Sequence, residues 1–180
     1  MITGHRPQKL PKGSIHYIKL AILERVQALV DEHGTDMVLI TGMTLGPDQW
    51  FAEIGIKLGI PVHAHLPFKG QEKYWSEDAK SHYRDLLDLA SKVTIISDTQ
   101  SRNAYLLRNI SMVEQSDHCI AVWDGGTRSG TGHAVRNARE RGVSLDIIDP
   151  AQNQPDSDMP PSTRRQLPAS LTFQRTSPQA

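Results

Sequence analysis

Short apolar runs alternate with helix-length amphipathic segments through the first 150 residues, and this alternation limits the fold more than any other feature. Each run is rich in β-branched residues and is followed by turn-forming residues, a pattern typical of a buried strand. The opening residues 1–3 form a candidate sixth strand, which Gly4 cuts short. The predicted strands cover residues 37–40, 61–66, 93–96, 119–123 and 143–148.

Between these runs, apolar side chains recur at three- and four-residue spacing, as on the buried face of a helix. Regular alternation of strand and helix favours parallel strands joined by crossover helices. We therefore expect an α/β fold, a Rossmann-like parallel sheet with helices on both faces. The predicted helices carry apolar stripes over residues 18–30, 50–58, 83–90, 106–113 and 134–138.

Composition narrows the class of protein. The 180 residues include 20 basic and 20 acidic side chains, and this neutral balance predicts that nucleic acid is an unlikely partner. One cysteine, Cys119, rules out an internal disulfide, and no apolar stretch approaches the length of a membrane span. We expect a cytoplasmic protein with no membrane partner, no metal site and no cofactor.

The composition changes after Pro150. Residues 151–180 are rich in Pro, Gln, Ser, Asp and Thr and show little periodicity. We therefore expect residues 1–150 to form one domain and residues 151–180 to form a disordered or loosely docked C-terminal tail.

A glycine-rich turn, residues 124–133, joins the predicted strand 119–123 to the last predicted helix. Such a turn presents backbone N–H groups at the positive end of a helix dipole, where a phosphate binds readily. A flexible surface loop is the alternative interpretation. The turn contains the glycines Gly125, Gly126, Gly130 and Gly132, the hydroxyl donors Thr127 and Thr131, and the guanidinium of Arg128.

Polar residues also follow the other predicted strands, and ligands of parallel sheets bind outside the carboxyl ends of the strands. His5 and Arg6 follow the first strand, where an imidazole and a guanidinium suit anion recognition. Gly42 and Asp48 follow the second strand. For these two, a structural role in the turn and at the helix dipole is an equal alternative.

Several short motifs occur in a fixed order along residues 1–150. They are Thr3-Gly4-His5-Arg6-Pro7, Gly46-Pro47-Asp48-Gln49-Trp50, Arg108-Asn109 followed by Met112-Val113, and Gly130-Thr131. In this order the chain resembles the YpsA-like branch of the SLOG superfamily. The resemblance implies a Rossmann-type fold that binds nucleotides or nucleotide-derived ligands, in bacteria or phages. Its relatives include the Lonely guy phosphoribohydrolases and the DNA-processing protein DprA.

The resemblance also implies one ligand site built from these motifs. Phosphate is expected on the glycine turn, with base and ribose facing Asp48, Trp50 and Asn109. A role in signalling, stress or phage–host conflict is implied, and a homodimer is expected by analogy with relatives. The implied ligand-binding residues are His5, Arg6, Gly42, Asp48, Trp50, Arg108, Asn109, Gly125, Gly126, Thr127, Gly130 and Thr131.

One departure from the relatives bears on catalysis. The phosphoribohydrolases carry a glutamate three residues after the threonine of their Gly-Thr turn, and Ala134 stands there in this chain. Cleavage of an N-glycosidic bond needs a carboxylate near the ribose, and Asp48, Asp98 and Asp124 are the candidate substitutes, with Asp48 or Asp124 favoured as the acid. Binding of a nucleotide-type ligand is thus the main hypothesis, and a nucleosidase or phosphoribohydrolase is the alternative. A DNA-associated module is a third hypothesis, which the neutral charge disfavours.

Overall fold

The computed structural model describes residues 1–152, and its elements follow the predicted alternation of strand and helix. The predicted tail falls on residues 153–180, outside the described residues, so the domain boundary near residue 150 stays a prediction. A short 3-10 turn that the sequence analysis did not anticipate, η1 (Pro7–Lys9), follows the first strand. The strands are β1 (Ile2–Gly4), β2 (Leu39–Thr41), β3 (Val62–Leu66), β4 (Lys92–Ile95), β5 (His118–Val122) and β6 (Ser144–Ile148).

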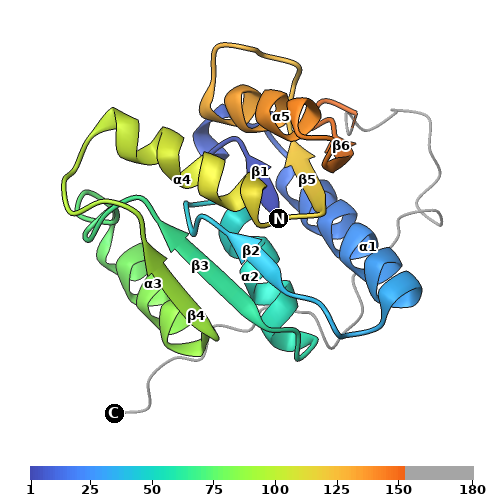
Figure 1. Ribbon diagram of the computed structural model, residues 1–180, viewed down its shortest axis with the longest axis horizontal. Helices are drawn as coiled ribbons and strands as arrows, with labels where there is room; N and C mark the ends of the chain where they lie inside the picture. The colour runs from blue at the N-terminus through green and yellow to red at the C-terminus, as the bar shows by residue number, and fades with distance from the viewer. Residues whose placement is uncertain (153–180) are drawn as a thin grey trace.

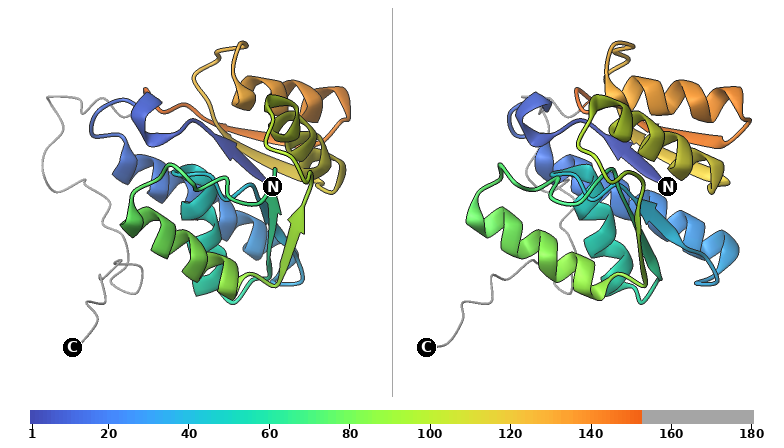
Figure 2. Two further views of the ribbon diagram at one scale, coloured as in Figure 1. Left: turned by 90° about the vertical axis from the view of Figure 1, so that its left-hand side faces the viewer. Right: turned by 60° about the vertical axis from the view of Figure 1, so that its left-hand side comes forward.

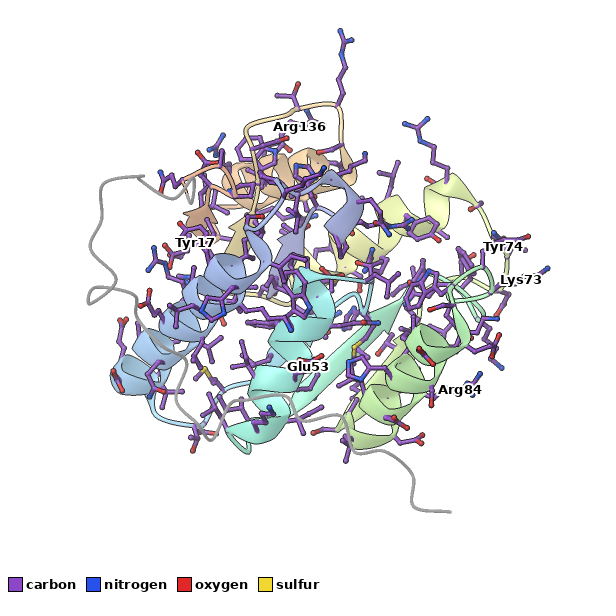
Figure 3. All side chains as sticks on the ribbon, turned by 180° about the vertical axis from the view of Figure 1, so that it is seen from behind. Tyr17, Glu53, Lys73, Tyr74, Arg84 and Arg136 are labelled. Atoms are coloured by element: carbon purple, nitrogen blue, oxygen red, sulfur yellow. The ribbon has the colours of Figure 1, made fainter. Side chains whose placement is uncertain are left out.

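The helices form two layers, one on each side of the strands. The helices α1, α2 and α3 pack in a row on one side, and α4 packs against α5 on the other (Figures 1 and 3). The α/β Rossmann-like prediction is therefore confirmed. The helices are α1 (Ile15–His33), α2 (Pro47–Lys57), α3 (Glu77–Leu89), α4 (Arg102–Glu114) and α5 (Gly130–Glu140).

The strands pair in parallel in two groups of three, with orders β1-β5-β6 and β2-β3-β4. In the first group Ile2 lies opposite Ile120 and Gly4 lies opposite Val122. The two groups adjoin because β1 also contacts β2. This arrangement brings the segments that follow β1, β2 and β5 to the same edge of the molecule (Figure 2).

Serine side chains begin three of the helices. Ser76, Ser101 and Ser129 each accept a hydrogen bond from the backbone N–H three residues later, at the starts of α3, α4 and α5. Such caps satisfy N–H groups that have no partner inside the helix. Pro47 begins α2, at a position where the missing N–H of proline costs nothing.

The largest apolar core lies between the strands and the layer of α1 and α2, and it includes the fully buried Phe51 and Ile22. A smaller cluster under α4 and α5 contains Cys119, which is buried as predicted. The strand β4 is less covered than predicted, because it lies at the end of its group and Val93 and Ile95 are each at least 40% exposed. None of the helices in residues 1–152 combines the length and the apolar character needed to cross a membrane.

At Gly55, α2 packs closely on side chains of the strands beneath it. A Cβ added there would lie 2.7 Å from Cδ1 of Leu39 and 2.9 Å from Cγ2 of Val62. We expect Gly55→Ala to destabilise the protein by about 1–3 kcal/mol through overpacking. Helix propensity alone predicts the opposite sign, a gain of up to about 1 kcal/mol.

Urea denaturation measures this difference, with Ser81→Ala on the exposed face of α3 as the matched control. The control should change the free energy of unfolding by less than about 0.5 kcal/mol. A Gly55→Ala protein more stable than the wild type would show that α2 does not pack this closely.

Candidate functional site

A cleft of about 740 Å³ opens at the carboxyl ends of β1 and β5. The segment after β1 leads to α1 on one side of the strands, and the segment after β5 leads to α5 on the other side (Figure 1). Two neighbouring parallel strands whose connections leave in opposite directions produce such a crevice, and it is the usual ligand site of open α/β sheets. The loop before α2 and the inner side of α4 complete the walls.

The walls of the cleft carry far more positive than negative charge. Among the described residues that line it, six are arginine or lysine and one, Asp48, is acidic. The protein is neutral as a whole, so its negative charges lie mainly elsewhere. A concave surface with one sign of charge concentrates ligands of the opposite sign. The six cationic residues are Arg6, Lys9, Arg102, Arg108, Arg128 and Arg136.

His5 lies at the base of the cleft and is only 6% exposed. Its Nε2 is 2.9 Å from Oδ1 of Asp124, and its Nδ1 is 3.4 Å from Oγ1 of Thr131. The same Asp124 oxygen accepts a hydrogen bond from the backbone N–H of Gly126. The hydrogen bonds from His5 and then from Gly126 lower the pKa of Asp124, so this side chain is a carboxylate at neutral pH.

Asp48 and Arg108 form a buried pair on the opposite wall. Oδ2 of Asp48 lies 3.5 Å from Nη1 of Arg108 and accepts hydrogen bonds from the hydroxyl and the backbone N–H of Thr44. Burial raises the pKa of Asp48, and Arg108 and Thr44 oppose that rise. Burial likewise lowers the pKa of Arg108. Within residues 1–152 the Nε of Arg108 has no hydrogen-bond partner.

Gly42 explains how Arg108 fits beneath the cleft. A Cβ at Gly42 would lie 1.2 Å from Nη1 of Arg108 and 2.9 Å from Oδ2 of Asp48. The guanidinium therefore occupies the space that a side chain at position 42 would fill. Gly42 positions Arg108 and does not itself line the cleft.

The start of α5 forms the third wall. The glycine turn folds back closely over the start of the helix. A Cβ added at Gly132 would lie only 2.5 Å from the carbonyl oxygen of Gly126. Nδ2 of Asn109 donates to the carbonyl of Gly130 at 3.1 Å and joins α4 to this turn. Gly130 and Thr131 line the cleft, and the first N–H groups of a helix have no partner within it.

The structure brings most of the predicted site residues together and leaves five outside the lining. Gly42 lies behind Arg108, and Trp50 packs in the core with the Lys19 ammonium 5.2 Å from its ring. Gly125, Gly126 and Asp124 lie in the turn beyond the lining residues. The predicted residues that do line the cleft are His5, Arg6, Asp48, Arg108, Asn109, Thr127, Gly130 and Thr131.

Sequence reasoning missed several lining residues on α4 and α5. Arg102, Tyr105 and Met112 share one face of α4 with Asn109, and this spacing of three, four and three residues was visible in the sequence. Further lining residues outside the predicted set include Ile2, Lys9, Thr44, Leu106, Ser129, His133 and Arg136. Among residues 1–152 no group of three or more His, Cys, Asp and Glu side chains is placed to hold a metal ion.

A second cavity of about 680 Å³ lies at the opposite edge, where the strands begin. Apolar side chains of the core, including Met37, Leu39 and Phe51, form much of its lining. It lacks the excess of arginine that marks the cleft, because none of its described lining residues is arginine or lysine.

Fold and cleft together define a Rossmann-like domain with a cationic crevice between two parallel strands. The sequence profile of the YspA SLOG family, YpsA, matches residues 1–152, and the chain belongs to this family. A UPF0398 protein of Halalkalibacterium halodurans is 31% identical over 153 residues, which cover 78% of this chain and 79% of the relative. A UPF0398 protein of Shouchella clausii is 26% identical over 152 residues, 77% of this chain and 80% of the relative.

Solved structures share the fold at low sequence identity. DprA from Helicobacter pylori aligns with a TM-score of 0.57 at 16% identity, over 82% of this chain and 64% of that protein. DprA from Streptococcus pneumoniae aligns with a TM-score of 0.56 at 14% identity, over 82% of this chain and half of that protein. TM1055, a structural genomics target, aligns with a TM-score of 0.53 at 14% identity, over 80% of this chain and 69% of that protein.

The prediction that nucleic acid is an unlikely partner is wrong. DprA from Helicobacter pylori, which shares this fold, is described by its single-stranded DNA binding mode. The error has a physical cause, because a net charge of zero is a sum over the whole chain and the cleft alone carries six cationic residues against one carboxylate. The homodimer expected by analogy stays a prediction.

The buried pair of Asp48 and Arg108 gives a stability prediction. Arg108→Met keeps the aliphatic volume and leaves the Asp48 carboxylate unpaired, which should cost about 3–5 kcal/mol at pH 7. Because Arg108 opposes the rise in the Asp48 pKa, its loss raises that pKa further. A carboxyl group with a raised pKa in the folded state destabilises folding as the pH rises, so the cost should shrink towards pH 5.

Urea denaturation at several pH values measures this cost. The control is Arg141→Met, which breaks a 2.7 Å pair with Glu114 whose side chains are both about half exposed, and which should cost less than about 1 kcal/mol. An Arg108→Met protein as stable as the control at pH 7 would contradict the buried pair.

Proposed function

We propose that this protein binds a nucleotide or a nucleotide-derived ligand through its phosphates in the cleft between β1 and β5. The observation that carries the proposal is the charge of the walls, six cationic residues to one carboxylate in a protein with no net charge. Electrostatic attraction of this kind favours an anion with more than one charge. The proposed ligand domain spans residues 1–150.

The arrangement of the cations supports a phosphate at the start of α5. Arg108 lines the cleft, and its guanidinium lies 3.5 Å from the Asp48 carboxylate and is 6% exposed. Arginine recognises phosphate with paired N–H groups, and the first turn of a helix supplies further N–H donors. Gly130 leaves room for close approach, since the nearest atom to a Cβ there is Nδ2 of Asn109 at 3.9 Å.

The other lining residues support a ligand that carries an organic group. Tyr105 and Met112 of α4 and Ile2 of β1 add apolar and aromatic surface beside the cations. Ligand sites combine such surface with a few placed polar groups. A nucleotide supplies both the phosphate and the planar base, and the phosphates of a single-stranded oligonucleotide would meet the same cations.

Hydrolysis of an N-glycosidic bond is the second candidate, and one observation favours it. Asp48 is a buried carboxyl group in the cleft whose pKa is raised by burial, as expected of a general acid. Three observations weigh towards binding alone. Thr44 and Arg108 already engage Asp48, Asp124 is held by His5 outside the lining, and Ala134 offers only a methyl group.

Isothermal titration calorimetry tests binding with AMP, ADP-ribose, NAD and a short single-stranded DNA. At least one should bind more tightly than adenosine, which lacks phosphate, and the affinity should fall as salt is added. Arg108→Met should weaken binding about tenfold or more, the value of a hydrogen bond to a charged group.

The matched control is Arg84→Gln on α3, because α3 lies in the helix layer away from the cleft (Figure 3). Arg84→Gln changes the net charge by the same amount as Arg136→Gln on α5, and Arg136 lines the cleft. Only the α5 variant should weaken binding. Equal effects of the two, or no binding of any phosphate ligand at low salt, would contradict the proposed cleft.

Chromatography of the same mixtures tests hydrolysis. The reaction adds water across the bond between C1′ and the base nitrogen, and it releases free base and a ribose phosphate. We expect bound ligands to remain intact. Free base that accumulates with the wild type and not with Asp48→Asn would establish the second candidate instead.

A further inference from the structure

His5 is buried beneath the cleft, and both of its ring nitrogens have partners. Nε2 lies 2.9 Å from Oδ1 of Asp124 in the turn after β5, and Nδ1 lies 3.4 Å from Oγ1 of Thr131 on α5. Thr131 itself lines the cleft. A chain of hydrogen bonds therefore connects the carboxylate of Asp124 through the imidazole to a hydroxyl group on the wall of the cleft.

The Asp124 carboxylate fixes the direction of these hydrogen bonds. Asp124 can only accept, so Nε2 of His5 carries a proton and donates it. In a neutral imidazole the other nitrogen then has no proton and accepts. Nδ1 therefore accepts from the hydroxyl of Thr131, and the oxygen of Thr131 presents lone pairs to the cleft.

That orientation opposes an anion at Thr131. Protonation of His5 reverses it, because Nδ1 then carries a proton and donates to Oγ1 of Thr131. The hydroxyl proton of Thr131 is released to point into the cleft, towards an anion. The imidazolium also adds one positive charge beneath the ligand.

We infer that anion binding in the cleft is coupled to the uptake of a proton by His5, and that Thr131 is the donor which this proton switches towards the ligand. The inference rests on the proposed function and adds regulation by pH to the same site. Because linkage is reciprocal, an anion that favours the imidazolium binds more tightly as the pH falls. His5 acts here as a positioning residue, through Thr131.

Other charged groups line the same cleft, among them the carboxyl group of Asp48 on α2. Asp124 stabilises the imidazolium, while Arg6 beside it, Arg108 of α4 and Arg128 of the glycine turn oppose it until an anion neutralises them. A bound anion therefore removes the main obstacle to protonation. His133 of α5 is a second imidazole on the cleft wall and needs its own control.

Calorimetric titration with sulfate tests the inference, since sulfate itself does not titrate near neutral pH. Repeating the titration in buffers of different ionisation enthalpy gives the number of protons taken up for each sulfate bound. We expect net uptake of up to about one proton for each sulfate bound between about pH 5 and pH 8. Over the same range the affinity should fall by up to about tenfold for each unit of rising pH.

Variants assign the proton. His5→Asn replaces the imidazole with an amide that can still hydrogen-bond Thr131. This variant should bind sulfate without proton uptake. Thr131→Val removes the hydroxyl and should weaken binding more than Thr131→Ser, which keeps it. His133→Gln removes the other imidazole of the cleft, and proton uptake should persist in that protein whatever its affinity.

The nitrogen chemical shifts of His5 give an independent readout in the wild type. Addition of sulfate at fixed pH should increase the protonated fraction of Nδ1, while Nε2 stays protonated. Sulfate binding without proton uptake, or uptake that survives His5→Asn, would overturn the inference and leave the proposed function standing. Failure of sulfate and of every phosphate ligand to bind would overturn both.

Discussion

The pairing of β1 with β5 is the constraint on which the candidate site depends. Gly4 lies opposite Val122, and the backbone N–H of His5 donates to the carbonyl of Val122. This register places His5 beside Asp124, although 119 positions separate them in the chain. Because the two segments then leave towards opposite layers of helices, a cleft opens between them. The position of the cleft therefore follows from strand order.

The electrostatics of the cleft are unfavourable for the protein alone. A buried guanidinium with an unpartnered N–H costs about 1–3 kcal/mol, and burial also disfavours the carboxylate of Asp48. Gly42 maintains this arrangement, since any side chain there would displace Arg108. Proteins break rules of packing and polar pairing mainly at functional sites. An anionic ligand would offset the excess of positive charge on the cleft walls.

Sequence periodicity was sufficient to predict the strands and helices, because the helices have apolar faces and the central strands β1, β2, β3 and β5 are short and mostly buried. It could not show that Trp50 turns into the core while Asp48, two residues earlier, faces the cleft, since both lie in the first turns of α2. The role of Gly42 depends on a contact with Arg108 from a distant helix. The excess of cations was hidden by the neutral total. The spacing of Arg102, Tyr105 and Asn109 along α4 could have placed Arg102 on the same helix face as Asn109.

The proposed phosphate site in the cleft between β1 and β5 can be tested by a nuclear magnetic resonance titration of the labelled protein with ADP-ribose. We expect the largest backbone amide shifts at Gly130, Thr131 and Asn109, around the start of α5. Shifts concentrated at Met37, Val38 and Ser116, which line the cavity at the opposite edge, would contradict it.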